Sequence, residues 1–322
     1  MLGRENMGFK SLTFPKALWL GPLAALAAAP APATPLAQGK TVAKAAAPAA
    51  QADPRPALWL LADEDTKIYM FGTIHVLPPG FRWRSPAVDR VVAEAAELVV
   101  ETYEPPGAGH SLESAPGFFS ERAVPILDRV PKEKREPLQA AIEASGVPLP
   151  FLDRMHSWAA AMTLGIAQML GEYGVDDPNE APGVEDVLEE TFRGAGKPIL
   201  SVEDGDAVLA SMGALPEAVQ VQLLIEAIEP VPDGVEGEAA ADELEWAAGK
   251  YEALDLEGEQ GFPPALFEVL VRRRNAAWTD WLAERMKKPG TLLFAVGAGH
   301  LAGRESVQAM LARRGLTVRR VD

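Results

Sequence analysis

The chain has 322 residues, of which 48% are hydrophobic and 24% charged, so it is long enough to bury a large core without disulfide bonds. It contains no cysteine, which excludes disulfides, thiolate metal ligands, a cysteine nucleophile and a thiol-linked lipid anchor. Its formal net charge of −16 argues against nucleic acid or an anionic membrane surface as a partner.

Residues 1–37 have the composition of an export signal. Arg4, Lys10 and Lys16 form a positively charged start, the apolar run 17–29 follows, and small residues after it offer cleavage sites. The apolar run is shorter than the roughly 20 residues that span a bilayer. We therefore predict a periplasmic or secreted protein that is not stably inserted in a membrane after signal removal. The alternative is an uncleaved N-terminal anchor.

The folded domain is predicted to cover residues 57–322. It follows a flexible linker over residues 38–56, which consists mainly of Ala, Pro, Lys and Gln. Two strand-like runs, 57–62 and 67–76, open the domain and predict a hairpin. The second run contains the segment Gly-Thr-Ile-His, whose last residue is His75.

A helix and a strand are predicted next. Ser85 and Pro86 are typical of the N-cap and the first turn of a helix, and apolar residues at helical spacing follow them. Residues 98–102 then predict a strand that carries Glu101 near its end.

The middle of the chain is predicted to be mostly helical. Helices are expected over residues 118–129, 132–145, 154–172, 184–194, 205–213, 216–229, 238–253 and 263–287. A strand over residues 197–202 interrupts these helices and is followed directly by Glu203.

The end of the chain returns to strand and helix. Residues 291–296 predict a buried strand, and the segment Gly-Ala-Gly-His follows it and ends at His300. A helix over 303–314 and a strand over 316–321 complete the chain. We predict an α/β fold, with α+β as the alternative. Its sheet core comes from the N- and C-terminal strands, is flanked by helices and is interrupted by a large central helical insertion.

His75 and His300 occur in matching contexts. Each is the last residue of a Gly-x-x-His segment next to an apolar strand, and the chain has only four histidines. Glycine lets the backbone bend or approach another group closely, and open α/β sheets bind ligands where strands become loops. The two histidines are therefore candidates to meet in one site. The alternative is two separate histidines that hydrogen-bond loops.

Three glutamates are candidates for a metal ligand or a general base. Glu101 and Glu203 end strands, and Glu185 begins a helix. A carboxylate in such a position binds a hard or borderline metal or takes a proton from water. For each, the alternative is a solvated carboxylate, and Glu185 also suits a helix N-terminus through the helix dipole.

Arg274 and Asn275 lie together on the long helix before the last predicted strand. Asn275 is a candidate to fix a ligand, and Arg274 to bind a carboxylate or an oxyanion. The alternative is a basic helix face. Trp278 is interpreted as core, and His110 and His156 as structural or incidental.

Several well-known motifs are missing from the chain. It has no His-Glu-x-x-His, no Gly-x-Ser-x-Gly, no phosphate-binding Gly-x-x-x-x-Gly-Lys and no dinucleotide fingerprint. A serine nucleophile outside such motifs stays an open alternative.

The motifs together resemble the TraB/PrgY/GumN family, which also includes the animal Tiki proteases. The resemblance covers residues 57–322, and its last segment is the most specific. The segments that carry it are FGTIHV at 71–76, VVE at 99–101, GVE at 183–185, GKP through VED at 196–204, Arg274-Asn275, and AVGAGHL at 295–301. Glu185 and Asp204 depart from the family pattern, in which aspartate and threonine are more often expected.

The resemblance implies a fold related to the erythromycin esterase and ChaN-like group. Through the Tiki branch it implies a metal-dependent peptidase that uses Mn²⁺ or Co²⁺, with Zn²⁺ as a further option. It implies His75, His300 and Glu101 around the metal, with Glu185 or Glu203 completing the site or carrying the proton.

In the same picture Arg274 and Asn275 orient the substrate or stabilise developing oxyanion charge. The expected partner is a peptide or small-molecule substrate. One alternative is a non-catalytic protein that sequesters a peptide, haem or metal, and a ChaN-like haem role would use a histidine as axial ligand. Another is an esterase-like enzyme with a histidine base and no metal.

Overall fold

A computed structural model of the chain contains one mixed sheet of six strands flanked by helices, which confirms the predicted α/β fold. The structure describes residues 52–107, 115–121, 124–175, 177, 180–229, 241–251, 256 and 262–322. The predicted signal peptide, most of the linker and His110 lie outside these residues, and the statements made about them above stay predictions.

The strands lie in the order β4-β3-β5-β2-β1-β6. Their bounds are β1 Leu58–Ala62, β2 Thr66–Thr73, β3 Glu97–Val100, β4 Ile199–Ser201, β5 Gly290–Gly297 and β6 Val318–Arg320. Strands β2, β5, β3 and β4 run parallel, whereas β1 is antiparallel to both β2 and β6. The carboxyl ends of the four parallel strands therefore share one edge of the sheet, which is where such sheets bind ligands.

The predicted hairpin forms from β1 and β2. Its turn is stabilised by Asp63, whose carboxylate accepts hydrogen bonds from the backbone N–H of Asp65 and of Thr66, at 3.2 and 2.9 Å. Aspartate favours such turns because its short side chain bonds the backbone two or three residues ahead. Residues 292–297 of β5 and residues 68–73 of β2 are all buried, as expected for strands covered on both faces.

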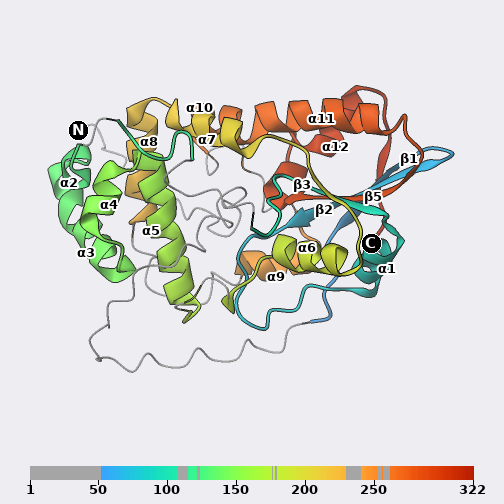
Figure 1. Cartoon of the computed structure of the whole chain (residues 1–322), viewed down its shortest axis with the longest axis horizontal. Helices are drawn as coiled ribbons and strands as arrows, with labels where there is room; N and C mark the ends of the chain where they lie inside the picture. Colours follow the sequence, from blue (N-terminus) through green and yellow to red (C-terminus); the bar gives the residue numbers. More distant parts are fainter. Residues whose placement is uncertain are drawn as a thin grey trace, which may run out of the picture.

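Helices cover both faces of the sheet (Figure 1). Helices α11, Arg273–Arg285, and α12, Val307–Arg313, lie on one side, and α1, Pro86–Glu94, and α6, Val184–Gly194, lie on the other. Helix α1 begins as predicted, because the Ser85 hydroxyl accepts from the N–H of Val88 at 3.2 Å.

A helical block lies at the end of the molecule remote from β1 and β6 (Figure 1). It consists of α2 Ile126–Arg129, the 3₁₀ turn η4 Lys132–Lys134, α3 Arg135–Ser145, α4 Leu149–Arg154, α5 Ser157–Glu172, α7 Gly205–Gly213 and α8 Glu217–Ala227. The helix predicted over 118–129 is wrong at its start. Among the described residues of this range, only the last turn, α2, is helical, because Pro125 cannot continue a helix from before it and instead takes the N-cap position. Phe119 forms a β-bridge with Met155.

The helix predicted over 263–287 is continuous but irregular. It consists of α10, Pro264–Phe267, a π-helical turn η8, Glu268–Arg272, and α11. A π turn inserts an extra residue and rotates the side chains that follow it, and such turns are frequent at functional sites. Arg274, the second residue after this turn, is buried, whereas Arg272 and Arg273 are exposed.

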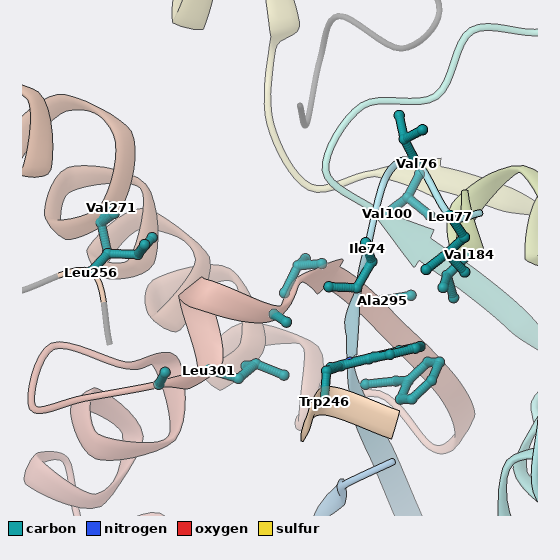
Figure 2. Packing of buried hydrophobic residues seen from close by; sticks show 14 of the residues in the cluster. Ile74, Val76, Leu77, Val100, Val184, Trp246, Leu256, Val271, Ala295 and Leu301 are labelled. Atoms are coloured by element: carbon teal, nitrogen blue, oxygen red, sulfur yellow. The ribbon is translucent and has the colours of Figure 1, made fainter. Parts of the chain in front are cut away.

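The core is one connected cluster of buried apolar side chains. Figure 2 shows its part near the strand ends, where Ile74, Val100 and Ala295 lie close to Trp246 of helix α9, Ala241–Ala247. Trp246 is fully buried and packs beside Phe71 and Trp83. The carboxyl edge of the sheet is thus enclosed by aromatic side chains.

In the described part of the chain, no single helix has the length and apolar character needed to cross a membrane, although α7 and α8 pass that test together as a pair bent by 99°.

Candidate functional site

The two Gly-x-x-His segments lie side by side at the carboxyl edge of the sheet. Strands β2 and β5 pair in parallel, with Thr73 opposite Gly297. A methyl group placed on Gly297 would lie 3.5 Å from Nε2 of His75 and 3.5 Å from Cδ2 of His300. The structure therefore brings the two histidines to one place, with the side-chain-free face of Gly297 between them.

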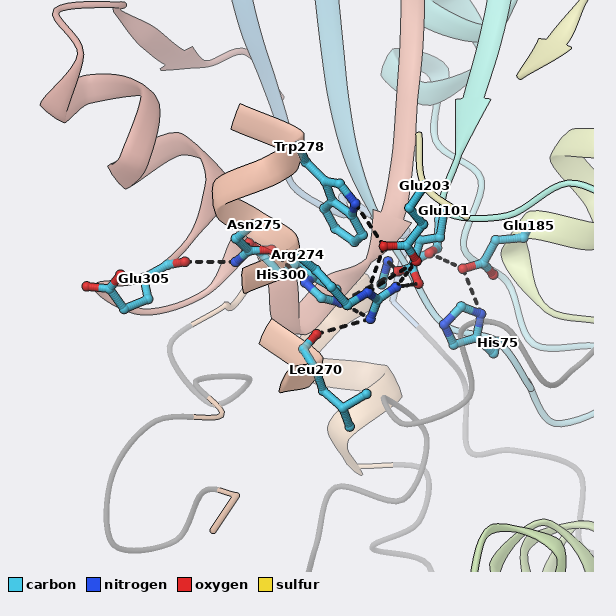
Figure 3. Close-up of polar contacts among 12 residues, drawn as sticks. His75, Glu101, Glu185, Glu203, Leu270, Arg274, Asn275, Trp278, His300 and Glu305 are labelled. Atoms are coloured by element: carbon cyan, nitrogen blue, oxygen red, sulfur yellow. Dashed lines mark hydrogen bonds and ion pairs between the residues drawn. The ribbon is translucent and has the colours of Figure 1, made fainter. Parts of the chain in front are cut away.

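His75 is bound to Glu185. Its Nδ1 lies 2.8 Å from Oε1 of Glu185, and the Thr73 hydroxyl donates to the same oxygen (Figure 3). A carboxylate only accepts, so Nδ1 carries the proton and Nε2 keeps a lone pair. Among the described residues, no hydrogen-bond partner is found for Nε2. His75 thus presents a free basic nitrogen toward Gly297.

The start of helix α6 is fixed against His75. Val184 donates its backbone N–H to the Ile74 carbonyl at 2.9 Å, and Asp186 accepts from the N–H of Gly183 at 2.7 Å. A side chain on Gly183 would overlap the carbonyl oxygen of His75, so only glycine allows this approach. This close packing is what places Glu185 against the imidazole.

The surroundings raise the pKa of His75. Burial works to lower that pKa, but Glu185, and then Glu101 and Asp186, favour the charged ring, and the net direction is upward from 6.5. A histidine held by a carboxylate in this way is a stronger base than one in water.

The surroundings of His300, unlike those of His75, favour the neutral ring. Its Nδ1 lies 2.6 Å from Oδ1 of Asn275, while the Asn275 amide nitrogen donates to the backbone carbonyls of His300 and Glu305, at 3.2 and 2.7 Å. Because the amide nitrogen is committed to carbonyls, Oδ1 is the acceptor and Nδ1 of His300 is the donor. Its Nε2 accepts from Nη1 of Arg274 at 3.1 Å. Burial, followed by the Arg274 charge, lowers the pKa of His300 to about 3, so the ring is neutral.

Arg274 is the buried cation at the centre of the site. Its guanidinium donates to both oxygens of Glu203, at 3.1 and 2.9 Å, and to Oε2 of Glu101. It also donates to the Leu270 carbonyl at 3.1 Å, and its carbon lies 4.8 Å from the centroid of Trp278 (Figure 3). With the bond to His300, the guanidinium is held in one orientation by four hydrogen-bonding groups and an aromatic ring.

The two carboxylates that hold Arg274 come from neighbouring parallel strands. Glu101 follows β3, Glu203 follows β4, and the N–H of Glu203 donates to the Glu101 carbonyl at 3.2 Å. The other oxygen of Glu101 accepts from the N–H of Gly297 at 2.8 Å, and Trp278 donates its indole N–H to Glu203 at 3.0 Å. Every carboxylate oxygen of the pair is therefore satisfied.

The pKa values of these two carboxyl groups move in opposite directions. Burial raises the pKa of Glu101, but the Arg274 charge, with help from the two histidines, lowers it to about 2. For Glu203 burial outweighs Arg274, and Glu101 adds repulsion, so its pKa is raised. Glu101 therefore keeps its negative charge at neutral pH.

The predicted metal ligands do not fit a metal ion in this arrangement. No three His, Asp or Glu side chains of the described part of the chain are arranged as a metal site. Oε2 of Glu101 and Nε2 of His300 accept from Arg274, and Oε1 of Glu185 accepts from His75. A guanidinium and a divalent cation repel each other and compete for the same lone pairs. The place predicted for a metal charge is taken by Arg274.

The seven site residues predicted from the sequence all lie at this site: His75, Glu101, Glu185, Glu203, Arg274, Asn275 and His300. The sequence did not predict that Arg274 would be the cation that the others surround. His156 lies elsewhere, before α5, where burial lowers its pKa. Sequence reasoning assigned Trp278 to the core alone and overlooked Thr73. The position of Thr73 inside the Gly-Thr-Ile-His segment was the only available signal for it.

Comparison with known proteins agrees with the resemblance seen in the motifs. The sequence model of the TraB/PrgY/gumN family matches residues 57–320. The uncharacterized protein YbaP of Escherichia coli (strain K12) is 25% identical over 269 residues, which cover 80% of this chain and 92% of YbaP. The YbaP protein of Shigella flexneri matches with the same identity and coverage. No solved structure matches significantly.

Proposed function

This chain belongs to the TraB/PrgY/gumN family, and from that premise we propose that it is a hydrolase of peptide bonds in which His75 activates a water molecule. One observation carries the proposal: Nδ1 of His75 is bound to Glu185 at 2.8 Å, while Nε2 faces the centre of the site. This is the arrangement of a general base, because the carboxylate fixes the tautomer and stabilises the imidazolium that forms.

Arg274 supplies the positive charge of the reaction. When water adds to a peptide carbonyl, the oxygen becomes negative, and a guanidinium held in place by Glu101, Glu203 and Trp278 needs no rearrangement to stabilise it. All five N–H groups of Arg274 already have partners, in Glu203, Glu101, the Leu270 carbonyl and His300, so we assign to Arg274 stabilisation of the oxyanion by its charge rather than by a hydrogen bond.

The reaction balances with these groups alone. Nε2 of His75 takes a proton from water as the water oxygen bonds the carbonyl carbon. The same proton then goes to the departing amine nitrogen as the carbon–nitrogen bond breaks, which leaves a carboxylic acid and an amine. Glu101 and Asn275 touch neither reactant and act by holding Arg274, Gly297 and His300 in place.

Export is the second part of the proposal. Arg4, Lys10 and Lys16 followed by the apolar run 17–29 support a signal peptide, and with it a periplasmic or secreted enzyme that meets peptides outside the cytoplasm.

The proposal is tested with the purified chain and a peptide library. The protein is treated with a chelator, dialysed, and assayed with no metal, Mn²⁺, Co²⁺ or Zn²⁺, with the His75→Ala and Arg274→Met variants in parallel. We expect cleavage without added metal and none in either variant. His156→Ala is the matched control, because this histidine lies outside the site and its loss should leave cleavage intact.

Two outcomes would overturn parts of the proposal. Cleavage that needs an added metal would show that a metal ion replaces Arg274 beside Glu101 and His300, and would support the metal-dependent peptidase that the family resemblance implies. Absence of cleavage with every peptide, together with tight binding of a peptide, haem or metal, would favour a sequestering protein. A haem complex would be recognised by its visible absorption band.

A further inference from the structure

Gly72 is the point where three separate parts of the chain touch. It lies in β2, three residues before His75, and its carbonyl accepts the indole N–H of Trp246 at 2.9 Å. The hydroxyl of Tyr251 lies 3.5 Å from the same carbonyl. A side chain on Gly72 would overlap that hydroxyl and would come within 2.9 Å of the Cα of Ala298, in the second Gly-x-x-His segment.

Trp246 is therefore bound to the strand end in the interior of the protein. It is fully buried in α9 and lies beside Phe71 and Trp83, with ring centroids 6.1 and 6.5 Å apart (Figure 2). A buried indole N–H with no partner is costly, and so is a buried carbonyl. The bond satisfies both groups and fixes how far α9 stands from the two histidine segments.

Three residues before Trp246, α9 carries a second buried polar side chain, the carboxyl group of Glu243. Glu243 is 1% exposed, and one of its oxygens accepts from the Tyr173 hydroxyl at the end of α5 at 2.7 Å. Its other oxygen, Oε2, is buried and has no hydrogen-bond partner among the described residues. The charged groups that act on it are Asp242 of its own helix and Glu172 beside Tyr173, and both are acidic.

We propose that α9 is the positioning element of the site and that it docks against the sheet with Glu243 protonated. When α9 is docked, the hydrogen bond from Trp246 to the Gly72 carbonyl fixes the position of the strand end that carries His75. An ionised Glu243 would leave a negative charge buried next to other acidic groups with one neutral donor, and such a charge favours undocking of the helix. Trp246 is a positioning residue here, because it contacts the strand that carries His75 rather than any reacting atom.

The expected pH dependence follows from burial. Burial raises the pKa of Glu243 from 4.5 to about 7 in the docked helix. The docked form therefore holds its proton over a range in which the undocked form has lost it. The equilibrium constant for docking is therefore highest below pH 4.5. It falls by about tenfold per pH unit between pH 4.5 and about 7, and is constant above that.

Hydrogen exchange of the full chain tests this without any substrate, so a negative result here is separate from failure of the hydrolase proposal. Protection factors, corrected for intrinsic exchange, are measured at pH 5, 6, 7 and 8 for the amides of α9 and the indole N–H of Trp246. In the parent protein we expect protection to fall from pH 5 to 7. In Glu243→Gln, which keeps an acceptor for Tyr173 without a charge, protection should stay constant. An equal fall in both proteins, or loss of protection in the variant at every pH, would overturn the role of Glu243.

The link to the site is tested with Trp246→Phe. We expect at least tenfold lower protection for the amides of Val184 and Gly297, which bond the Ile74 carbonyl and Glu101 at the site, while the amides of α3 keep theirs. Trp83→Phe is the matched control, because this ring belongs to the same aromatic group but is not bonded to Gly72. A uniform loss over the whole chain, or an equal effect of the two variants, would show that Trp246 only fills the core.

Discussion

Nδ1 of His75 lies 2.8 Å from Oε1 of Glu185, although one residue follows strand β2 and the other belongs to helix α6. The contact has a direction: it leaves the proton on Nδ1 and the lone pair on Nε2.

The acid limb of the hydrolysis profile should report the pKa of His75. Activity needs the neutral ring, and the pKa is raised above 6.5, so kcat/KM should fall as the pH drops through a value higher than that of a free histidine. In Glu185→Gln the imidazolium loses its partner, and the limb should move to lower pH while kcat falls about 10²- to 10⁴-fold. The measurement is kcat/KM between pH 5 and 9. Glu189→Gln, one turn further along α6, should leave the limb in place, and an unmoved limb in Glu185→Gln would refute the role of His75 as base.

Gly297→Ala should block the site while the domain stays folded. The backbone angles of Gly297, φ −47° and ψ 133°, suit alanine, and the new methyl would meet Glu101 Oε1 at 3.2 Å and the two imidazoles at 3.5 Å. We expect hydrolysis to fall by about 10²-fold, the scale of a misplaced reacting group, and stability by about 1–2 kcal/mol from overpacking. Gly194→Ala, which meets nothing within 4 Å, is the control. Full activity in Gly297→Ala would mean that the space between the histidines is not used.

Arg274→Met should destabilise the protein far more than the same change next to it. It removes the cation from two buried carboxylates, and breaking a buried ion pair costs about 3–5 kcal/mol. Arg273→Met removes an exposed arginine that pairs with Glu268 on the surface, and should change stability by less than about 0.5 kcal/mol. Urea unfolding of both variants gives the comparison. Equal stabilities would contradict the assignment of Arg274 as the buried partner of Glu101 and Glu203.

Gly183→Ala should destabilise, and Gly165→Ala should stabilise. A methyl on Gly183 would overlap backbone atoms of His75, and backbone atoms cannot move aside as a flexible side chain can. We therefore expect the free energy of unfolding to fall by about 2–3 kcal/mol. Gly165 lies inside α5 with nothing within 4 Å of its missing side chain, and alanine there should add about 0.5–1 kcal/mol. Thermal unfolding distinguishes the two signs. If Gly183→Ala were neutral, α6 would not be held against His75 as described.

Much of the site was predictable because the chemistry sits at strand ends. His75, Glu101 and His300 each follow a short apolar run, and parallel strands bring such positions to one edge. The hairpin of β1 and β2 and the Ser85 cap were predictable for a similar reason, since the signals for both are local.

The partners of these residues were not predictable in the same way. Sequence reasoning placed a metal among His75, His300 and Glu101, and named Arg274 only as a group that binds a carboxylate or an oxyanion. In the structure Arg274 contacts both His300 and Glu101. Arg274 lies on the buried face of α11 with Asn275, Trp278 and Leu282, at regular helical spacing, whereas Arg272 and Arg273 are exposed. Helical spacing indicates which face is buried, but not which carboxylates from distant strands lie against it.

The place of β5 in the sheet has a consequence for how the protein is made. This strand lies between β2 and β3, yet it is formed by residues 290–297, close to the end of the chain. Until those residues leave the ribosome, the strands that precede His75 and Glu101 have no common neighbour, and each exposes an unpaired edge. Closing so long a loop is slow compared with forming the hairpin or the helices. For most of its synthesis the nascent chain therefore lacks Arg274, Asn275 and His300, and the site can assemble only once β5 is inserted between β2 and β3.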